Sequence, residues 1–170
     1  TSTEIMEFDG INWRQIRLPD NPTGASSRGL AKDKNGVIFY GSAGSIGYLK
    51  RNKFGDLEAE SLKYLIPQEN RNFEEIWSVQ YDGEFLYFQS REYLFRLSYD
   101  LEKGEFDLKS YPAYSTFSQG FIIHGEYIIH DLDTGLYKMI NNKLELIPGS
   151  EVLAGDRLFS LVPYLNNPET

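Results

Sequence analysis

Cysteine is absent from the 170-residue chain, and histidine occurs only twice. Without a thiol the chain cannot form a disulfide framework, a thiolate zinc site or a cysteine nucleophile. No stretch approaches the roughly 18 continuous apolar residues that a membrane-spanning helix needs. A charged start followed by an apolar core, which would mark a signal peptide, is also missing. We therefore expect no metal, no cofactor and no direct membrane insertion by this segment.

Positive charge is scarce and scattered. The chain has 17 Lys and Arg against 25 Asp and Glu, a net charge of -8, and its longest basic run is the pair Lys50-Arg51. Nucleic-acid binding needs a concentrated basic face that neutralises phosphates. The composition therefore excludes a nucleic-acid partner.

Hydrophobic and aromatic residues are plentiful. Hydrophobic residues make up 41% of the chain and charged residues 25%, the balance of a globular domain. Aromatic residues contribute 15%, mostly as 12 Tyr and 11 Phe. Flat rings pack well on a pleated surface, so this composition favours β structure.

An internal repeat organises the chain. The segments "DKNGVIFYGS", "QYDGEFLYFQS" and "IIHGEYIIHDL" align on Gly36, Gly83 and Gly125, which are 47 and 42 residues apart. Each pairs a turn residue with glycine between two β-rich runs, which predicts a tight hairpin. Two further markers keep nearly the same period: an aromatic residue twelve positions after each glycine, and a proline after an alternating run. These markers are Tyr48, Phe95 and Tyr137, and Pro19, Pro67, Pro112 and Pro148.

Each unit is predicted to contain four short antiparallel strands, with the proline closing the fourth. Units of about 40 to 50 residues with four strands are typical of β-propeller blades. The fold class is therefore all-β, a partial β-propeller of three complete blades plus flanking strands of two more. The expected ranges are an N-terminal tail at 1–10, a propeller region at 11–165 with blades at 26–67, 74–112 and 117–148, and a C-terminal tail at 166–170.

The predicted array starts and stops within a blade. Residues 11–19 are expected to be the last strand of a preceding blade, and residues 156–162 the first strand of a following one. A propeller protects its sheet edges by closing a ring of four to eight blades, which three blades cannot do. We expect a fragment, or a ring completed by a second copy, with self-association through exposed blade edges.

The first two units resemble the two-component-regulator propeller repeat. The matching elements are the turn at Asp33-Lys34-Asn35-Gly36, the strand ending in Gly41-Ser42, and Gly47-Tyr48. Residues 75–97 look like the next repeat, whereas the third unit departs, with His130-Asp131 in place of Gly-Ser. The resemblance implies an extracytoplasmic, periplasmic sensor region of a bacterial inner-membrane signalling protein whose output is a histidine kinase, a diguanylate cyclase or a related regulator. It also implies a ligand, often a glycan.

The same topology predicts where a ligand would bind. Connections between blades and the turns between second and third strands emerge on one face, around the channel mouth, and loops on a rigid scaffold commonly carry function. Aromatic rings there could stack on a sugar, while arginines and carboxylates hold its hydroxyls. The predicted ligand-binding residues are Arg71, Trp77, Arg91, Tyr93, Asp131 and Asp133.

Catalysis is the weaker hypothesis. His124 and His130 are expected at opposite ends of one hairpin, which disfavours a metal pair. Carboxylates at Glu74, Glu75, Asp131 and Asp133 lack any spacing that would fix a glycosidase pair. We therefore expect no enzymatic activity in this chain and no catalytic residue. A protein-interaction propeller without a small ligand, and a propeller lyase or glycosidase, remain the alternatives.

Overall fold

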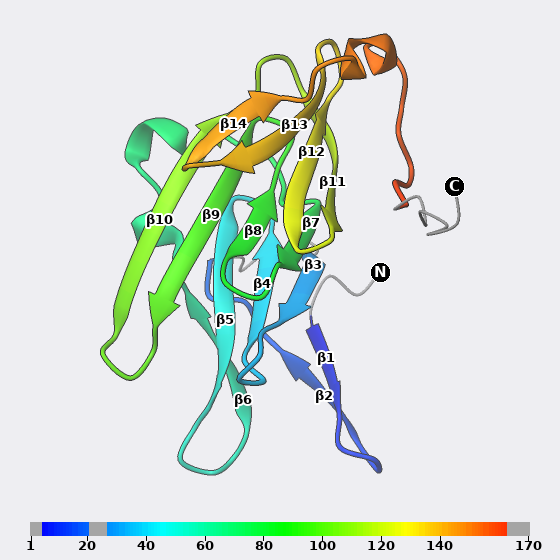
Figure 1. Cartoon of the computed structure of the whole chain (residues 1–170). Helices are drawn as coiled ribbons and strands as arrows, with labels where there is room; N and C mark the ends of the chain where they lie inside the picture. The colour runs from blue at the N-terminus through cyan, green and yellow to red at the C-terminus, as the bar shows by residue number, and fades with distance from the viewer. Residues whose placement is uncertain (1–4, 21–26, 163–170) are drawn as a thin grey trace.

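The computed structural model describes residues 5–20 and 27–162, and these form an all-β chain of antiparallel sheets. Three four-stranded sheets follow one another along the sequence, and a two-stranded hairpin precedes them (Figure 1). The predicted fold class, a partial β-propeller with three four-stranded blades, is confirmed. The strands are β1 (Ile5–Phe8), β2 (Trp13–Ile16), β3 (Ser27–Lys32), β4 (Ile38–Ser42), β5 (Ser45–Arg51), β6 (Leu57–Ser61), β7 (Ser78–Tyr81), β8 (Leu86–Gln89), β9 (Tyr93–Asp100), β10 (Glu105–Pro112), β11 (Phe117–Ile123), β12 (Glu126–Asp131), β13 (Gly135–Ile140) and β14 (Lys143–Leu146).

The turn glycines define the first hairpin of each blade, as the repeat predicted. Gly36, Gly83 and Gly125 have φ angles of 85°, 108° and 79°, which side chains other than glycine rarely adopt. In the first blade the carboxylate of Asp33 accepts hydrogen bonds from the backbone N–H groups of Asn35 and Val37 at 2.9 and 2.7 Å. Residues next to each other in sequence therefore close this hairpin.

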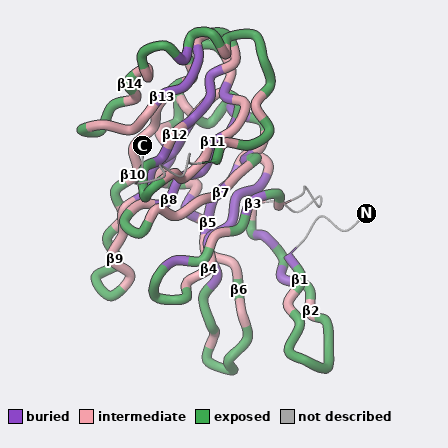
Figure 2. Tube along the Cα trace, turned by 45° about the vertical axis from the view of Figure 1, so that its right-hand side comes forward, coloured by how far each residue is buried: buried purple, intermediate pink, exposed green. Residues whose placement is uncertain are grey.

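The blades pack face to face, with β3, β7 and β11 as neighbouring inner strands. β7 contacts both β3 and β11, so the second blade lies between the other two. Figure 2 shows buried chain through the middle strands and exposed chain at the hairpin tips. The largest hydrophobic cluster lies between the first and second blades and includes Phe39, Ile76 and Phe88, none of them exposed.

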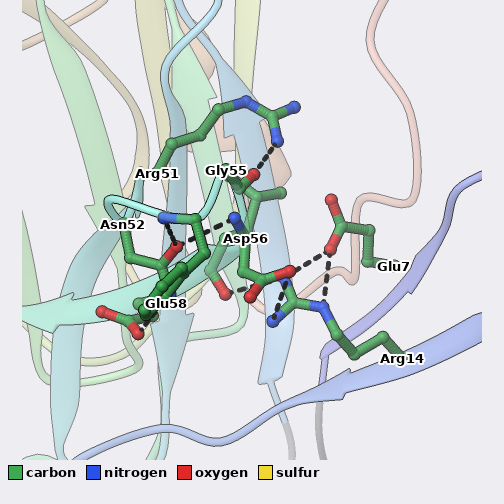
Figure 3. Close-up of polar contacts among 9 residues, drawn as sticks. Glu7, Arg14, Arg51, Asn52, Gly55, Asp56 and Glu58 are labelled. Carbon is green, nitrogen blue, oxygen red and sulfur yellow. Dashed lines mark hydrogen bonds and ion pairs between the residues drawn. The ribbon is translucent and has the colours of Figure 1, made fainter.

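The range 1–10 is not simply a tail, because β1 lies within it. Residues 5–8 pair with β2 around a turn at Asp9-Gly10, where Gly10 has a φ of 101°. The hairpin packs on the first blade through Ile5 and Ile16. Figure 3 shows the polar contacts here: within the hairpin Arg14 lies 2.6 Å from the carboxylate of Glu7, and it also contacts Asp56 of the β5–β6 turn in the first blade.

Two other predicted boundaries differ. β6 ends at Ser61 rather than at Pro67, and the 3₁₀ helices η1 (Lys63–Leu65) and η2 (Gln68–Asn70) follow it. The side chains of Leu62 and Ile66 are buried in the apolar cluster. The chain leaves the strand to bury them, so β6 does not continue to Pro67. Residues 156–162 do not form the predicted strand, because no described strand lies beside them to accept hydrogen bonds. The third 3₁₀ helix, η3 (Ser150–Leu153), precedes this segment.

The C-terminal end of the predicted domain division cannot be compared with the fold. The range 166–170 and residues 163–165 lie outside the described part of the chain. No helix in residues 5–20 and 27–162 is long and apolar enough to cross a bilayer.

Candidate functional site

The connections between blades lie next to the turns that join the second and third strands of each blade, as the topology predicted. The N–H of Gly44 donates to the carbonyl of Glu74 at 3.0 Å, that of Ala113 to Glu92 at 2.9 Å, and that of Gly155 to Leu132 at 2.7 Å. Each bond joins a turn to the connection that leaves the same blade. We call this end of the blades the loop face. Its backbone is fixed by hydrogen bonds, so side chains on it are held on a rigid platform.

Trp77 stands on the loop face directly before β7. Its backbone N–H donates to the carbonyl of Gln89 at 2.7 Å, and 38% of its surface is exposed. The guanidinium carbons of Arg28 and Arg91 lie 4.4 and 4.9 Å from the centre of its ring. Arginine near an indole ring is attracted by the ring quadrupole, so two blades are joined at this point.

The two arginines beside Trp77 differ in their ion pairs. The Nε of Arg28 lies 2.7 Å from a carboxylate oxygen of Glu75, which follows the connection from the first blade. Arg91 has no ion pair within the described residues. An exposed indole edge, one paired guanidinium and one unpaired guanidinium can together bind a flat or ring-shaped ligand that carries hydrogen-bond acceptors or negative charge.

Two of the predicted ligand-binding residues are hydrogen-bonded to other residues and do not contact Trp77. The guanidinium of Arg71 donates to the carbonyls of Ile66 and Tyr64 at 2.8 and 3.3 Å. The hydroxyl of Tyr93 donates to the side chain of Asn72 at 3.2 Å, and its ring lies against Phe95. Both side chains shape the connection between the first and second blades.

Asp131 is buried and serves the fold. It accepts hydrogen bonds from the backbone N–H and hydroxyl of Ser115 at 2.9 and 2.6 Å, and from the hydroxyl of Thr134 at 2.8 Å. Burial alone would raise the pKa of Asp131, but these hydrogen bonds together hold it below its ordinary value. Asp133 is exposed two residues further on, and its N–H donates to Ser115.

The two histidines have ordinary structural roles. His130 is fully buried: Nδ1 lies 2.8 Å from the hydroxyl of Ser118, and Nε2 lies 3.3 Å from the carbonyl of Leu153. A carbonyl only accepts, so Nε2 donates in this contact, and the hydroxyl of Ser118 is the partner of Nδ1. His124 occupies the β11–β12 turn with a φ of 52°. The two residues are therefore at opposite ends of β12, as predicted.

Sequence reasoning brought Trp77 and Arg91 together but missed Arg28. The repeat itself contained the information, because Arg28 and Glu75 each stand eight residues before their turn glycines, Gly36 and Gly83. Equivalent positions on neighbouring inner strands lie close together, so opposite charges there predict the observed ion pair.

Successive four-stranded antiparallel sheets that pack face to face around neighbouring inner strands define the β-propeller class. Solved structures agree. A streptogramin B lyase structure matches with a TM-score of 0.56 and 14% identity over 88% of this chain. A catalytically inactive virginiamycin B lyase from Staphylococcus aureus, solved with quinupristin, matches with a TM-score of 0.57 and 13% identity over 88% of this chain. A protein from Lactobacillus plantarum matches with a TM-score of 0.50 and 13% identity over 85%.

These similarities establish the fold and no more. The chain spans about half of each of these three proteins, 50%, 50% and 49% of their lengths. No protein-family model and no curated protein matches the sequence. The resemblance to the two-component-regulator repeat therefore supports a propeller, while membership of that family stays a prediction.

Proposed function

We propose that this chain is the ligand-sensing propeller segment of a bacterial membrane-anchored signalling protein, on its extracytoplasmic side. The ligand binds the loop face at Trp77, between Arg28 and Arg91, and is a glycan that carries carboxylate groups. Binding stabilises one arrangement of the loop face over another, and this difference in affinity is passed to the attached output module.

The arrangement around Trp77 is the observation that carries the proposal. The exposed part of the indole ring gives a sugar an apolar surface to pack against beside the two guanidinium groups, and a guanidinium group binds a carboxylate through two parallel hydrogen bonds. Arg91 has no carboxylate partner among the described residues, so an acidic sugar would supply one. Arg28 and Glu75 form the wall on the side of the first blade.

A propeller lyase is the second candidate, because the lyases named above share the fold. A lyase needs a general base that reaches the substrate. His130 is buried with both ring nitrogens engaged, and the carboxylate of Asp131 accepts hydrogen bonds from Ser115 and Thr134. The carboxylate of Glu75 pairs with Arg28. Binding without turnover is therefore the better-supported function, and incubation with quinupristin should leave that compound chromatographically unchanged.

Tryptophan fluorescence tests the binding site directly. Trp13 and Trp77 are the two tryptophans of the chain, so a Trp13→Phe variant reports on Trp77 alone. Titration with trigalacturonate should shift and strengthen the emission of this variant, whereas neutral maltotriose should have a much weaker effect. Arg91→Ala should weaken trigalacturonate binding about tenfold, the loss of roughly 1.4 kcal/mol.

Arg51→Ala is the matched control, because Arg51 is exposed and its side chain donates to the carbonyl of Gly55, at the opposite end of the first blade from Trp77. Its affinity for trigalacturonate should equal that of the parent. An emission spectrum unaffected by either saccharide would contradict the proposed site. The signalling role is tested separately, on the full-length gene. A gene that encodes neither a membrane span nor a kinase or cyclase module would contradict it.

A further inference from the structure

A cavity of about 280 Å³ lies between the second and third blades, at the opposite end from the loop face. Its walls come from the β7–β8 turn, β8 and β9 on one side and from β12, β13 and the turns next to them on the other. Tyr87 and Tyr127 line it, with their rings stacked 4.0 Å apart and nearly parallel. The cavity is therefore bounded by aromatic surface from both blades.

Arg96 brings a buried positive charge to this cavity. Its side chain comes from the middle of β9 and is only 8% exposed, and its guanidinium carbon lies 4.0 Å from the ring centre of Phe85. One of its nitrogens donates to the side-chain carbonyl of Asn142, and no carboxylate of the described residues forms an ion pair with it. Burying a cationic group without a carboxylate partner is unfavourable, so an anionic ligand would be favoured at this position.

The acidic residues at the edge of the cavity already have other partners. Asp82 accepts hydrogen bonds from the N–H groups of Glu84 and Phe85 and from the hydroxyl of Tyr87, all within 2.7 to 2.8 Å. Glu126 lies 2.5 Å from the ammonium group of Lys138. Neither side chain forms an ion pair with Arg96, and within the described part of the chain Asn142 is the one side chain that accepts a hydrogen bond from it. The other N–H donors of the guanidinium group lie beside the cavity without a side-chain partner in those residues.

We propose that this cavity is a second binding site, distinct from the loop face, for a small aromatic carboxylate. The carboxylate takes two hydrogen bonds from Arg96, whose planar fork matches it, while Asn142 lies beside the pair. The ring of the ligand packs against Phe85, Tyr87 and Tyr127. Because these residues come from two blades, occupation of the cavity links the second blade to the third.

Benzoate and benzamide make a matched pair of probes, since they share shape and differ in charge. In two-dimensional NMR of the full chain, benzoate at millimolar concentration should shift the amide resonances of Tyr127 and Asn142. It should also raise the melting temperature in proportion to its concentration, as ligand binding to the folded state requires. Benzamide should do neither.

Two variants separate recognition from folding. Arg96→Met keeps the apolar stem and should weaken benzoate binding at least about tenfold. Asn142→Asp supplies the missing carboxylate, at a turn position with a φ of 63° that aspartate tolerates, and should raise the melting temperature while abolishing benzoate binding. Arg51→Met, the same chemical change on an exposed arginine, should bind benzoate normally. Equal binding of benzamide, or unchanged binding by Asn142→Asp, would overturn the proposal even if Arg96→Met failed to fold.

Discussion

The two interfaces between adjacent blades are built from different chemistry. Between the first and second blades the contact is apolar and close: a Cβ atom at Gly41 would lie 2.2 Å from a methyl carbon of Ile76. Between the second and third blades, aromatic rings share the space with Arg96 and a cavity of about 280 Å³. There the side-chain oxygen of Gln89 is buried and finds no hydrogen-bond partner in the described residues.

The difference in packing suits the two interfaces to different tasks. A close-packed apolar contact gains stability from excluded water, but it offers no room for a ligand. Buried polar groups without partners and empty space cost stability, and they are uncommon in native proteins. The apolar core of the first interface therefore stabilises the array and leaves ligand binding there to the loop face, while the second interface has internal room for the small ligand proposed above.

Phe88→Ala tests the apolar interface and should have the largest effect. Phe88 is completely buried in the cluster between the first and second blades, so its loss removes apolar contact and leaves a cavity. We expect the free energy of unfolding, measured by urea denaturation, to fall by about 4 kcal/mol. Met139→Ala, in a residue that lines the existing cavity of the second interface, should cost about 1 kcal/mol. Equal losses at both positions would erase the distinction between the interfaces.

The propeller could be predicted because its strongest determinants are local. Gly36, Gly83 and Gly125 close hairpins with residues next to them in sequence, and their spacing gives the period. The hairpin of β1 and β2 carried the same information, since Asp9-Gly10 is a turn of the same kind. It was missed because that hairpin stands outside the repeat, where no counterpart could be aligned.

The site was harder to predict because it depends on contacts between blades. Trp77 and Arg91 could be assigned to the loop face from topology alone, and they lie together. Arg71 and Asp131 belong to the same face, but backbone carbonyls and hydroxyl groups use their polar atoms. Nothing in the alternation of β9 distinguishes Arg96 from an exposed strand residue, since only the third blade buries it.

Asp131→Asn tests the loop-face end of the second interface and should have an intermediate effect. Asp131 joins Ser115 of the connection to Thr134 of the third blade, and an amide cannot accept all of these hydrogen bonds. We expect a loss of about 2 kcal/mol at pH 7, measured by urea denaturation.

The pH dependence of the free energy of unfolding tests whether the charge of Asp131 causes the loss of stability in Asp131→Asn. The pKa of Asp131 is depressed in the folded protein, so its stabilisation is complete above the ordinary carboxyl pKa and is lost as the pH falls below it. The parent and Asp131→Asn should therefore converge in stability in acid. Asp133→Asn is the matched control in the same turn, exposed to solvent, and should change stability by less than about 0.5 kcal/mol. A comparable loss in Asp133→Asn would show that general charge, rather than the Asp131 network, stabilises this junction.

Tyr99→Phe tests a polar contact that joins the hairpin turn of the first blade to the second blade. The hydroxyl of Tyr99 donates to Asp33, while the Tyr99 ring lies 4.8 Å from Phe39. Phenylalanine keeps the ring contact, and Asp33 keeps its bonds to the turn, so the expected loss in the free energy of unfolding is about 1 kcal/mol. Tyr64→Phe, at an exposed tyrosine, is the control and should leave the urea midpoint unchanged. If Tyr99→Phe were as costly as Phe88→Ala, the first interface would depend on this hydrogen bond rather than on its apolar contact.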